Sequence, residues 1–191
     1  GLDLDADRFH DLCEELGFNA SVNTELGCAT SKFDLTDDNA TSWSRLQTAI
    51  GQGSTLITPI QNLLITSAIA NGGTAMRPYI VSEIDDAYGN VYKTFDGAKD
   101  KKIMSSSEAK ILSEYMRKVV TDGTGSRAQG DNYTVAGKTG SAEWNENKDT
   151  HAWFVGFLND EAHPYAFVTF VEEGGDGLGT AGVVTSRYLR T

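Results

Sequence analysis

VAGKTGSAEW, residues 135–144, lies in the first of three successive segments that have the composition of β-strands. The three segments cover residues 133–143, 151–158 and 166–172, and short polar turns join them. Short connections of this kind link neighbouring antiparallel strands, so the three segments predict an antiparallel meander. Because helices are predicted outside this sheet, we expect an α+β fold in which helices pack on an antiparallel sheet.

Four segments are predicted to be helical: residues 7–16, residues 59–71, residues 106–120 and a final segment that starts near residue 179 and includes Tyr188. The second has Thr58 as its N-cap, Pro59 at its first position and Gly72 as its stop signal. The third begins with the capping-box spacing of Ser105 and Glu108. These end signals fix where the two longer helices begin.

The remaining chain is predicted to form loops and one further hairpin. Residues 19–44 are polar and lack periodicity, which predicts a long loop, and residues 48–54 are expected to form a glycine-containing turn. Residues 79–84 and 91–95 are rich in strand-forming residues and flank a turn that contains Gly89. They predict a β-hairpin.

Length and charge exclude several classes of protein. A chain of 191 residues is long enough for one domain of ordinary size or two small ones. Its net charge of −11, with 16 basic against 27 acidic residues, argues against a nucleic-acid partner, which requires a basic face. The most apolar stretch, residues 63–70, is too short to cross a bilayer.

The cysteines and histidines do not indicate a metal site. Cys13 and Cys28, together with His10, His151 and His163, do not have the spacing of zinc ligands. A disulfide between the two cysteines would close a short loop, but two buried thiols are the favoured interpretation. We therefore expect no structural metal and no cofactor.

The strongest candidate for chemistry is the motif from Gly137 to Ser141. Glycine weakens a strand, and Gly137 and Gly140 on either side of Lys138 and Thr139 are explained if the backbone of another molecule comes close there. The Lys138 ammonium and the Thr139 and Ser141 hydroxyls offer a compact cluster of donors to a carboxylate. The Ser141 N–H is a candidate for half of an oxyanion hole. Taken alone, the motif is weak evidence for a site, and a solvated lysine on a strand is the favoured interpretation.

Three residues close to the motif have two interpretations each. His151 fits a hydrogen-bonded structural histidine better than an acid or base. Trp144 is expected either to line a cleft or to pack. Glu143 fits an exposed carboxylate at the end of a strand better than a partner of a neighbouring basic residue.

Four ordered stretches resemble the C-terminal half of the transpeptidase domain of penicillin-binding proteins, most closely the class B type. They are AIGQGSTLITPIQNLLITSAIANGGTAMRPYIV, VVTDGTGSRA, VAGKTGSAEW and HAWFVGF, and the resemblance runs from about residue 7 to the end. It implies that Lys138 supplies positive potential in a substrate-binding segment that also includes Thr139, Gly140 and Ser141. In the family, the threonine and serine hold the carboxylate of a D-Ala-D-Ala stem peptide or a β-lactam, and the Ser141 amide completes the oxyanion hole.

The chain departs from the family pattern at the nucleophile. The family uses an S-x-x-K serine and lysine, then S-x-N, then K-T-G. This chain has Ser107 three positions before Lys110, and Ser21 two positions before Asn23, in the reverse order. Ser107 fits the first turn of a capped helix, so we expect neither serine to act. Residues 1–191 are therefore expected to be the C-terminal portion of one transpeptidase domain whose S-x-x-K and S-x-N parts lie upstream.

The resemblance implies that the full-length protein is a peptidoglycan D,D-transpeptidase that cross-links stem peptides by serine acyl transfer and is inhibited by β-lactams. It implies a location on the extracytoplasmic face of the bacterial cell membrane, with an anchor outside this sequence. Two alternatives are a non-catalytic scaffold and a related β-lactamase or β-lactam sensor. The expected partners are stem peptides and β-lactams, and apolar faces left uncovered predict self-association or association with the missing half of the domain.

Overall fold

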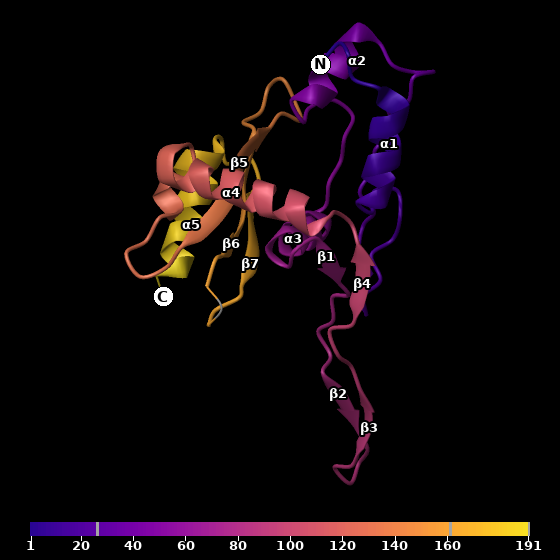
Figure 1. Ribbon diagram of the computed structural model, residues 1–191, viewed down its shortest axis with the longest axis vertical. Coiled ribbons are helices and arrows are strands. Elements are labelled where there is room, and N and C mark those ends of the chain that lie inside the picture. Colours follow the sequence, from indigo (N-terminus) through magenta and orange to yellow (C-terminus); the bar gives the residue numbers. More distant parts are fainter. Residues whose placement is uncertain (26, 161, 191) are drawn as a thin grey trace.

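The computed structural model describes residues 1–25, 27–160 and 162–190, and its centre is a three-stranded antiparallel sheet (Figure 1). The strands are β5 (Val135–Ala142), β6 (His151–Leu158) and β7 (Ala166–Val171), in the order β5-β6-β7. Thr139 lies opposite Phe154, which in turn lies opposite Thr169. The predicted meander is confirmed at nearly the predicted bounds.

Helices cover both faces of this sheet. On one face, α3 (Pro59–Ala70) and α4 (Ser106–Asp122) pack over a core of Met116, Ala136 and Phe157. On the other face, a π-helical turn, η2 (Gly177–Ala181), leads into α5 (Gly182–Leu189). Along each strand, the residues of this second face alternate with those of the first. Val135, Ala152 and Phe154 of the second face form a core cluster with residues that include Ala181 of η2. The α+β class is therefore confirmed.

The caps predicted for α3 and α4 are present. The Thr58 hydroxyl accepts a hydrogen bond from the Gln61 N–H at 3.3 Å, and Pro59 is the first residue of α3. At α4, the Ser105 hydroxyl accepts from the Glu108 N–H, and the Glu108 carboxylate accepts from the Ser105 N–H at 2.7 Å. This reciprocal pair holds the start of α4, the helix that packs along β5.

The N-terminal part forms its own small core. The helix α1 (Ala6–Glu15) ends before Gly17, which has a φ of +94° that suits glycine. Phe33, 2% exposed, packs in a cluster that includes Ala6, Cys13, Phe18 and Leu35. Cys13 is buried and Cys28 is half-buried, and both are thiols, so the prediction of two buried thiols holds fully only for Cys13. Burial raises the pKa of the Cys13 thiol to about 11.

One helix lies where the sequence predicted loop. The helix α2 (Ser42–Ala49) occupies the end of the predicted loop 19–44 and the start of the predicted turn 48–54. Its N-terminus is a capping box in which the Thr41 hydroxyl accepts from the Ser44 N–H and the Ser44 hydroxyl accepts from the Thr41 N–H. Serine replaces the usual Glu or Gln at the third helical position, which is why the pattern was missed.

The hairpin between α3 and α4 projects away from the sheet (Figure 1). It consists of β2 (Glu83–Asp85) and β3 (Val91–Thr94), which lie farther from the sheet than a second short pair, β1 (Thr74–Met76) and β4 (Lys99–Lys102). The first predicted strand, residues 79–84, was too long at its N-terminal end. The bond from the Phe95 N–H to the Ser82 carbonyl is the pairing next to the ladder, so the residues before Ser82 lie outside the strand.

Candidate functional site

The Lys138–Ser141 motif lies on an edge strand. In the sheet order β5-β6-β7, β5 pairs with β6 on one side, and no strand of the described residues pairs with its other side. The N–H and C=O groups on that side are therefore a template for an extended ligand. The motif occupies the second half of this open edge.

The Ser141 backbone faces the open edge. Its carbonyl oxygen accepts a hydrogen bond from Gln52 Nε2 at 3.3 Å, and Gln52 lies outside the sheet, before α3. The N–H and C=O of one residue in an extended strand point to the same side, so the Ser141 N–H faces the open edge too. Thr139, two residues earlier, has the same orientation. This is the orientation that an oxyanion-hole donor needs.

The motif's side chains approach that edge from opposite faces of the sheet. Lys138 is exposed, and its Nζ donates to the Thr139 carbonyl oxygen at 2.5 Å, which turns the ammonium toward the edge. Thr139 and Ser141 alternate with Lys138 and lie on the face that η2 and α5 cover. The three donors therefore flank the edge from both faces and do not form one cluster on a single face.

Two hydroxyls of the motif are held by neighbouring segments. Thr139 Oγ1 lies 2.7 Å from Thr124 Oγ1, in the turn between α4 and the short 3₁₀ helix η1 (Ser126–Ala128). Ser141 Oγ accepts from the Gly177 N–H at 3.2 Å. Because the serine oxygen acts there as an acceptor, its own proton can still be donated to a ligand carboxylate.

The packing around Gly137 and that around Gly140 differ in whether they would leave room for a side chain. A Cβ at Gly137 would lie 2.7 Å from Phe154 Cε1 and 2.8 Å from the Val155 carbonyl oxygen. A Cβ at Gly140 would meet Trp153 Cβ at 3.4 Å, an ordinary contact. Gly137 is therefore required by packing within the sheet, which corrects its interpretation as a site of ligand approach. That interpretation remains for Gly140 alone.

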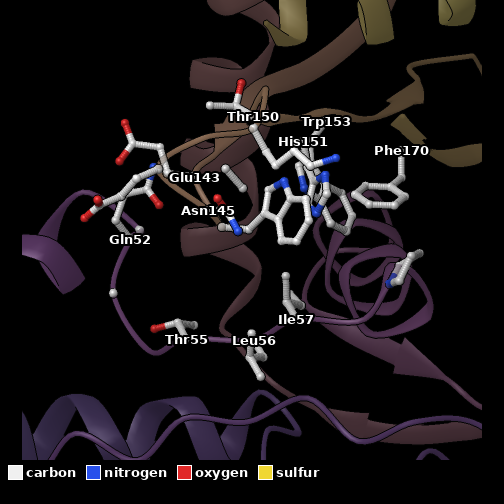
Figure 2. A pocket seen from close by; sticks show the side chains of 17 residues that line it. Gln52, Thr55, Leu56, Ile57, Glu143, Asn145, Thr150, His151, Trp153 and Phe170 are labelled. Carbon is white, nitrogen blue, oxygen red and sulfur yellow. The ribbon is translucent and has the colours of Figure 1, made fainter. Parts of the chain in front are cut away.

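An open groove of about 900 Å³ adjoins the end of β5 (Figure 2). One wall is formed by residues 51–57 before α3 and by Pro59 at its start, and the other by the connection from β5 to β6 with parts of β6 and β7. Figure 2 shows Gln52 and Glu143 toward one end of the groove and Trp153 and Phe170 toward the other. The groove thus begins where the Lys138–Ser141 edge ends.

Aromatic rings line the groove on the sheet side. The Trp144 and His151 rings are stacked, with centroids 5.0 Å apart and an angle of 11° between planes, and Trp153 contacts Phe170 at 4.5 Å. His151 Nδ1 accepts from the Glu173 N–H at 3.1 Å, so the ring is a hydrogen-bonded structural histidine, as predicted. Trp144 both packs and lines the groove, and Glu143 is exposed on its wall, as expected.

The serines of the S-x-x-K and S-x-N patterns, Ser107 and Ser21, do not lie beside the motif. Ser107 is exposed in the first turn of α4, and its Oγ is 3.0 Å from Ser105 Oγ within the helix cap. Ser21 follows α1 and lines a different pocket with Leu64 and Ala75. Neither serine lines the groove beside the motif. Among the described residues, no group of three or more His, Cys, Asp or Glu side chains could hold a metal ion.

Sequence reasoning missed Gln52, Thr124 and Gly177 as neighbours of the motif. Gln52 lies in the AIGQG stretch and Thr124 in VVTDGTGSRA, so the resemblance marked both segments without assigning these residues a role. Their contacts with the motif span 89 and 15 residues, and that of Gly177 spans 36. Contacts of such range depend on the fold, and no local spacing indicates them.

Comparison with known proteins places the chain in a family. The model of the penicillin-binding protein transpeptidase domain matches residues 1–190. Peptidoglycan D,D-transpeptidase PbpA of Mycobacterium tuberculosis is 29% identical over 189 residues, which are 95% of this chain. PbpA of Mycolicibacterium smegmatis is 32% identical over 139 residues, 70% of this chain.

Solved structures agree with this result. The D,D-transpeptidase domain of a peptidoglycan glycosyltransferase from Eggerthella lenta has a TM-score of 0.86 at 25% identity over 96% of this chain. Penicillin-binding protein A from M. tuberculosis, as an imipenem acyl-enzyme complex, has a TM-score of 0.81 at 26% identity over 93% of this chain. This chain spans 46% and 40% of those two chains, and 37% and 28% of the M. tuberculosis and M. smegmatis PbpA proteins.

Proposed function

The chain belongs to the penicillin-binding protein transpeptidase family, and we propose that it supplies one wall of the active site of a peptidoglycan D,D-transpeptidase. The substrate would be a stem peptide that ends in D-Ala-D-Ala. The observation that carries the proposal is the open edge of β5, on which the Ser141 backbone faces outward beside Lys138.

Each residue of the motif has a role in this proposal. The Lys138 ammonium supplies positive potential at the edge, and the Thr139 and Ser141 hydroxyls donate to the terminal carboxylate of the peptide. Gly140 lets the peptide backbone approach. The Ser141 N–H donates to the oxygen of the scissile carbonyl as negative charge develops on it.

The covalent step requires groups that we place outside this sequence. A serine Oγ attacks the carbonyl carbon of the penultimate D-Ala, a lysine accepts the serine proton, and the peptide C–N bond breaks. The proton goes to the departing terminal D-Ala, and an amine of a second stem peptide then releases the acyl group and restores the serine. The capped position of Ser107 supports this assignment, because its hydroxyl lies against Ser105 in the helix cap and does not line the groove.

The same wall would bind β-lactams through their carboxylate. The M. tuberculosis relative has been solved as acyl-enzyme complexes with imipenem, ceftriaxone and penicillin G, which supports this part of the proposal. We further propose that the protein works on the extracytoplasmic face of the cell membrane. In the part of the chain that the structure covers, no helix is long and apolar enough to span a bilayer.

The test is the rate of acylation by a penicillin in a version of the protein that includes the residues preceding Gly1. Lys138→Ala should lower the second-order rate constant by about 10²-fold or more, since it removes charge stabilisation at the site. Lys118→Ala, an exposed lysine of α4, is the control and should leave the rate unchanged. Equal rates for the Lys138 variant and the parent would refute the proposed role of the edge.

A further inference from the structure

Gln52 joins the segment before α3 to the open edge of β5. Its Nε2 donates to the Ser141 carbonyl oxygen at 3.3 Å, and its own backbone N–H donates to the Gln47 carbonyl at the end of α2, at 2.9 Å. Gln52 also lines the groove next to the motif (Figure 2). The backbone of Gln52 is therefore held by α2, and its side chain reaches from there to the sheet.

The carbonyl that Gln52 occupies is one that a ligand needs. When two antiparallel residues form a hydrogen-bonded pair, each donates its N–H to the carbonyl of the other. A ligand residue whose carbonyl accepts from the Ser141 N–H will thus present its own N–H to the Ser141 C=O. In the free protein, that acceptor holds the Gln52 amide.

The backbone around Gln52 allows its side chain to leave. Gly51 and Gly53 have φ angles of +79° and +90°, which glycine adopts without strain. A Cβ at Gly51 would meet nothing within 4 Å, and one at Gly53 would meet only Gln47 Cβ, at 3.4 Å. The backbone angles of Gly51 and Gly53 can therefore change when the Gln52 side chain moves away from the strand.

The bond itself is weak enough to be replaced. It is exposed, joins two neutral groups, and at 3.3 Å is longer than the usual N–H···O distance. A ligand amide that binds the same oxygen restores the bond that is lost.

We propose that Gln52 is a displaceable latch on the Ser141 carbonyl. It holds the edge in the free protein and gives way to a ligand residue that pairs with Ser141 through both its N–H and its C=O. A ligand without an N–H at that position does not compete for the carbonyl and leaves Gln52 in place, so the latch lowers the affinity only of ligands that have this N–H. This inference rests on the proposed edge binding of the peptide.

The experiment uses two dipeptides and the ¹⁵N-labelled chain. The ligands are N-acetyl-D-Ala-D-Ala and the same compound methylated on the nitrogen of the first D-Ala, and dissociation constants are measured by NMR titration. Gln52→Ala and Gln52→Met remove the donor, the second with little change in side-chain length. Gln129→Met is the matched control, since Gln129 is exposed and bonded to Arg117, outside the groove.

The latch predicts that both Gln52 variants bind the unmethylated dipeptide about two- to tenfold more tightly than the parent chain, because the competing donor is gone. Binding of the methylated dipeptide should gain less, so the preference for a free N–H increases in both variants. The Gln129 variant should match the parent for both ligands.

Three results would overturn the latch. Equal loss of affinity for both dipeptides in the Gln52 variants would mean that Gln52 stabilises the strand that binds them. Unchanged affinities would mean that Gln52 has no effect on binding. Binding that is absent in parent and variants alike would mean that the edge does not take the peptide, so the proposed function would fail together with the latch. Binding that is present but indifferent to Gln52 removes the latch alone.

Discussion

The Ser141 backbone and side chain have different partners. The carbonyl accepts from Gln52 on the open edge, while the hydroxyl accepts from the Gly177 N–H on the face covered by η2. A Cβ at Gly177 would lie 2.6 Å from the Trp153 carbonyl oxygen and 2.7 Å from that of Gly140, so only glycine allows this approach. The direction of the Ser141 N–H is therefore set before a ligand arrives, as electrostatic stabilisation of an oxyanion requires.

The two glycines of the motif should respond differently to alanine. Gly137→Ala should lower the free energy of unfolding by about 1–3 kcal/mol, because its Cβ would overlap the Phe154 ring and the Val155 carbonyl. Gly140→Ala should change it by no more than about 0.5 kcal/mol, because its Cβ meets Trp153 at an ordinary distance. Urea unfolding of both variants tests this, and equal losses would contradict the packing argument.

Cys13 should make stability fall at alkaline pH. Burial raises the pKa of its thiol from 9.0 to about 11, so between these values the unfolded chain releases a proton that the folded chain keeps. The stabilisation is fully present below pH 9 and should decline by roughly 2 kcal/mol as the pH rises to about 11. Unfolding free energies at pH 8 to 11 should fall more steeply for the parent than for Cys13→Ala, and parallel curves would contradict this assignment.

At the scale of elements, the first turns of α4 contain the S-x-x-K pattern of Ser107 and Lys110, and Ser105 is the N-cap of the helix. Ser105→Ala removes the hydroxyl that accepts from the Glu108 N–H and should cost about 1 kcal/mol of stability. Ser107→Ala is the neighbouring control, because the Ser107 hydroxyl contacts only the Ser105 hydroxyl among the described residues. Guanidinium unfolding followed by circular dichroism gives both values. A greater loss in the Ser107 variant would show that the cap has been assigned to the wrong serine.

Elements with strong local signals could be predicted from the sequence. The helices α3 and α4 have N-cap residues directly before their first residues. The strands β5, β6 and β7 follow one another along the chain and are separated only by short turns. By contrast, β1 and β4 have only three and four residues and pair across the whole hairpin region, so they have no local signature. The helix α2 was missed because its cap uses serine in place of a longer side chain.

The candidate site was predictable only in part, for the same reason. The type and order of residues from Gly137 to Ser141 indicated a sheet edge that binds a ligand with a carboxylate. In the structure, β5 is an edge strand of the sheet. Strand alternation explains why Lys138 and the two hydroxyls approach from opposite faces, whereas the residue types of the motif suggested a single cluster of donors. The contact with Gln52 depends on how the loop before α3 returns to the sheet, which no short-range pattern encodes.

At the scale of the whole molecule, large apolar side chains are exposed. Trp43, Ile50 and Leu56 are 69%, 75% and 61% exposed, and Tyr88 and Tyr92 on the projecting hairpin are 91% and 81% exposed. We expect the chain to self-associate or to pair with another segment that covers these side chains, because uncovered apolar surface favours association. Light scattering across a concentration series should show a rising average mass. A constant monomer mass would contradict this expectation.

We propose that this chain carries the carboxylate-binding wall of the site and that the nucleophile lies outside it. The most direct measurement is the intact mass after incubation with a penicillin, for this chain and for a version extended upstream of Gly1. We predict no adduct on the chain and one covalent adduct on the extended protein. A stoichiometric adduct on the chain alone, lost in Ser107→Ala, would contradict this placement and make Ser107 the nucleophile.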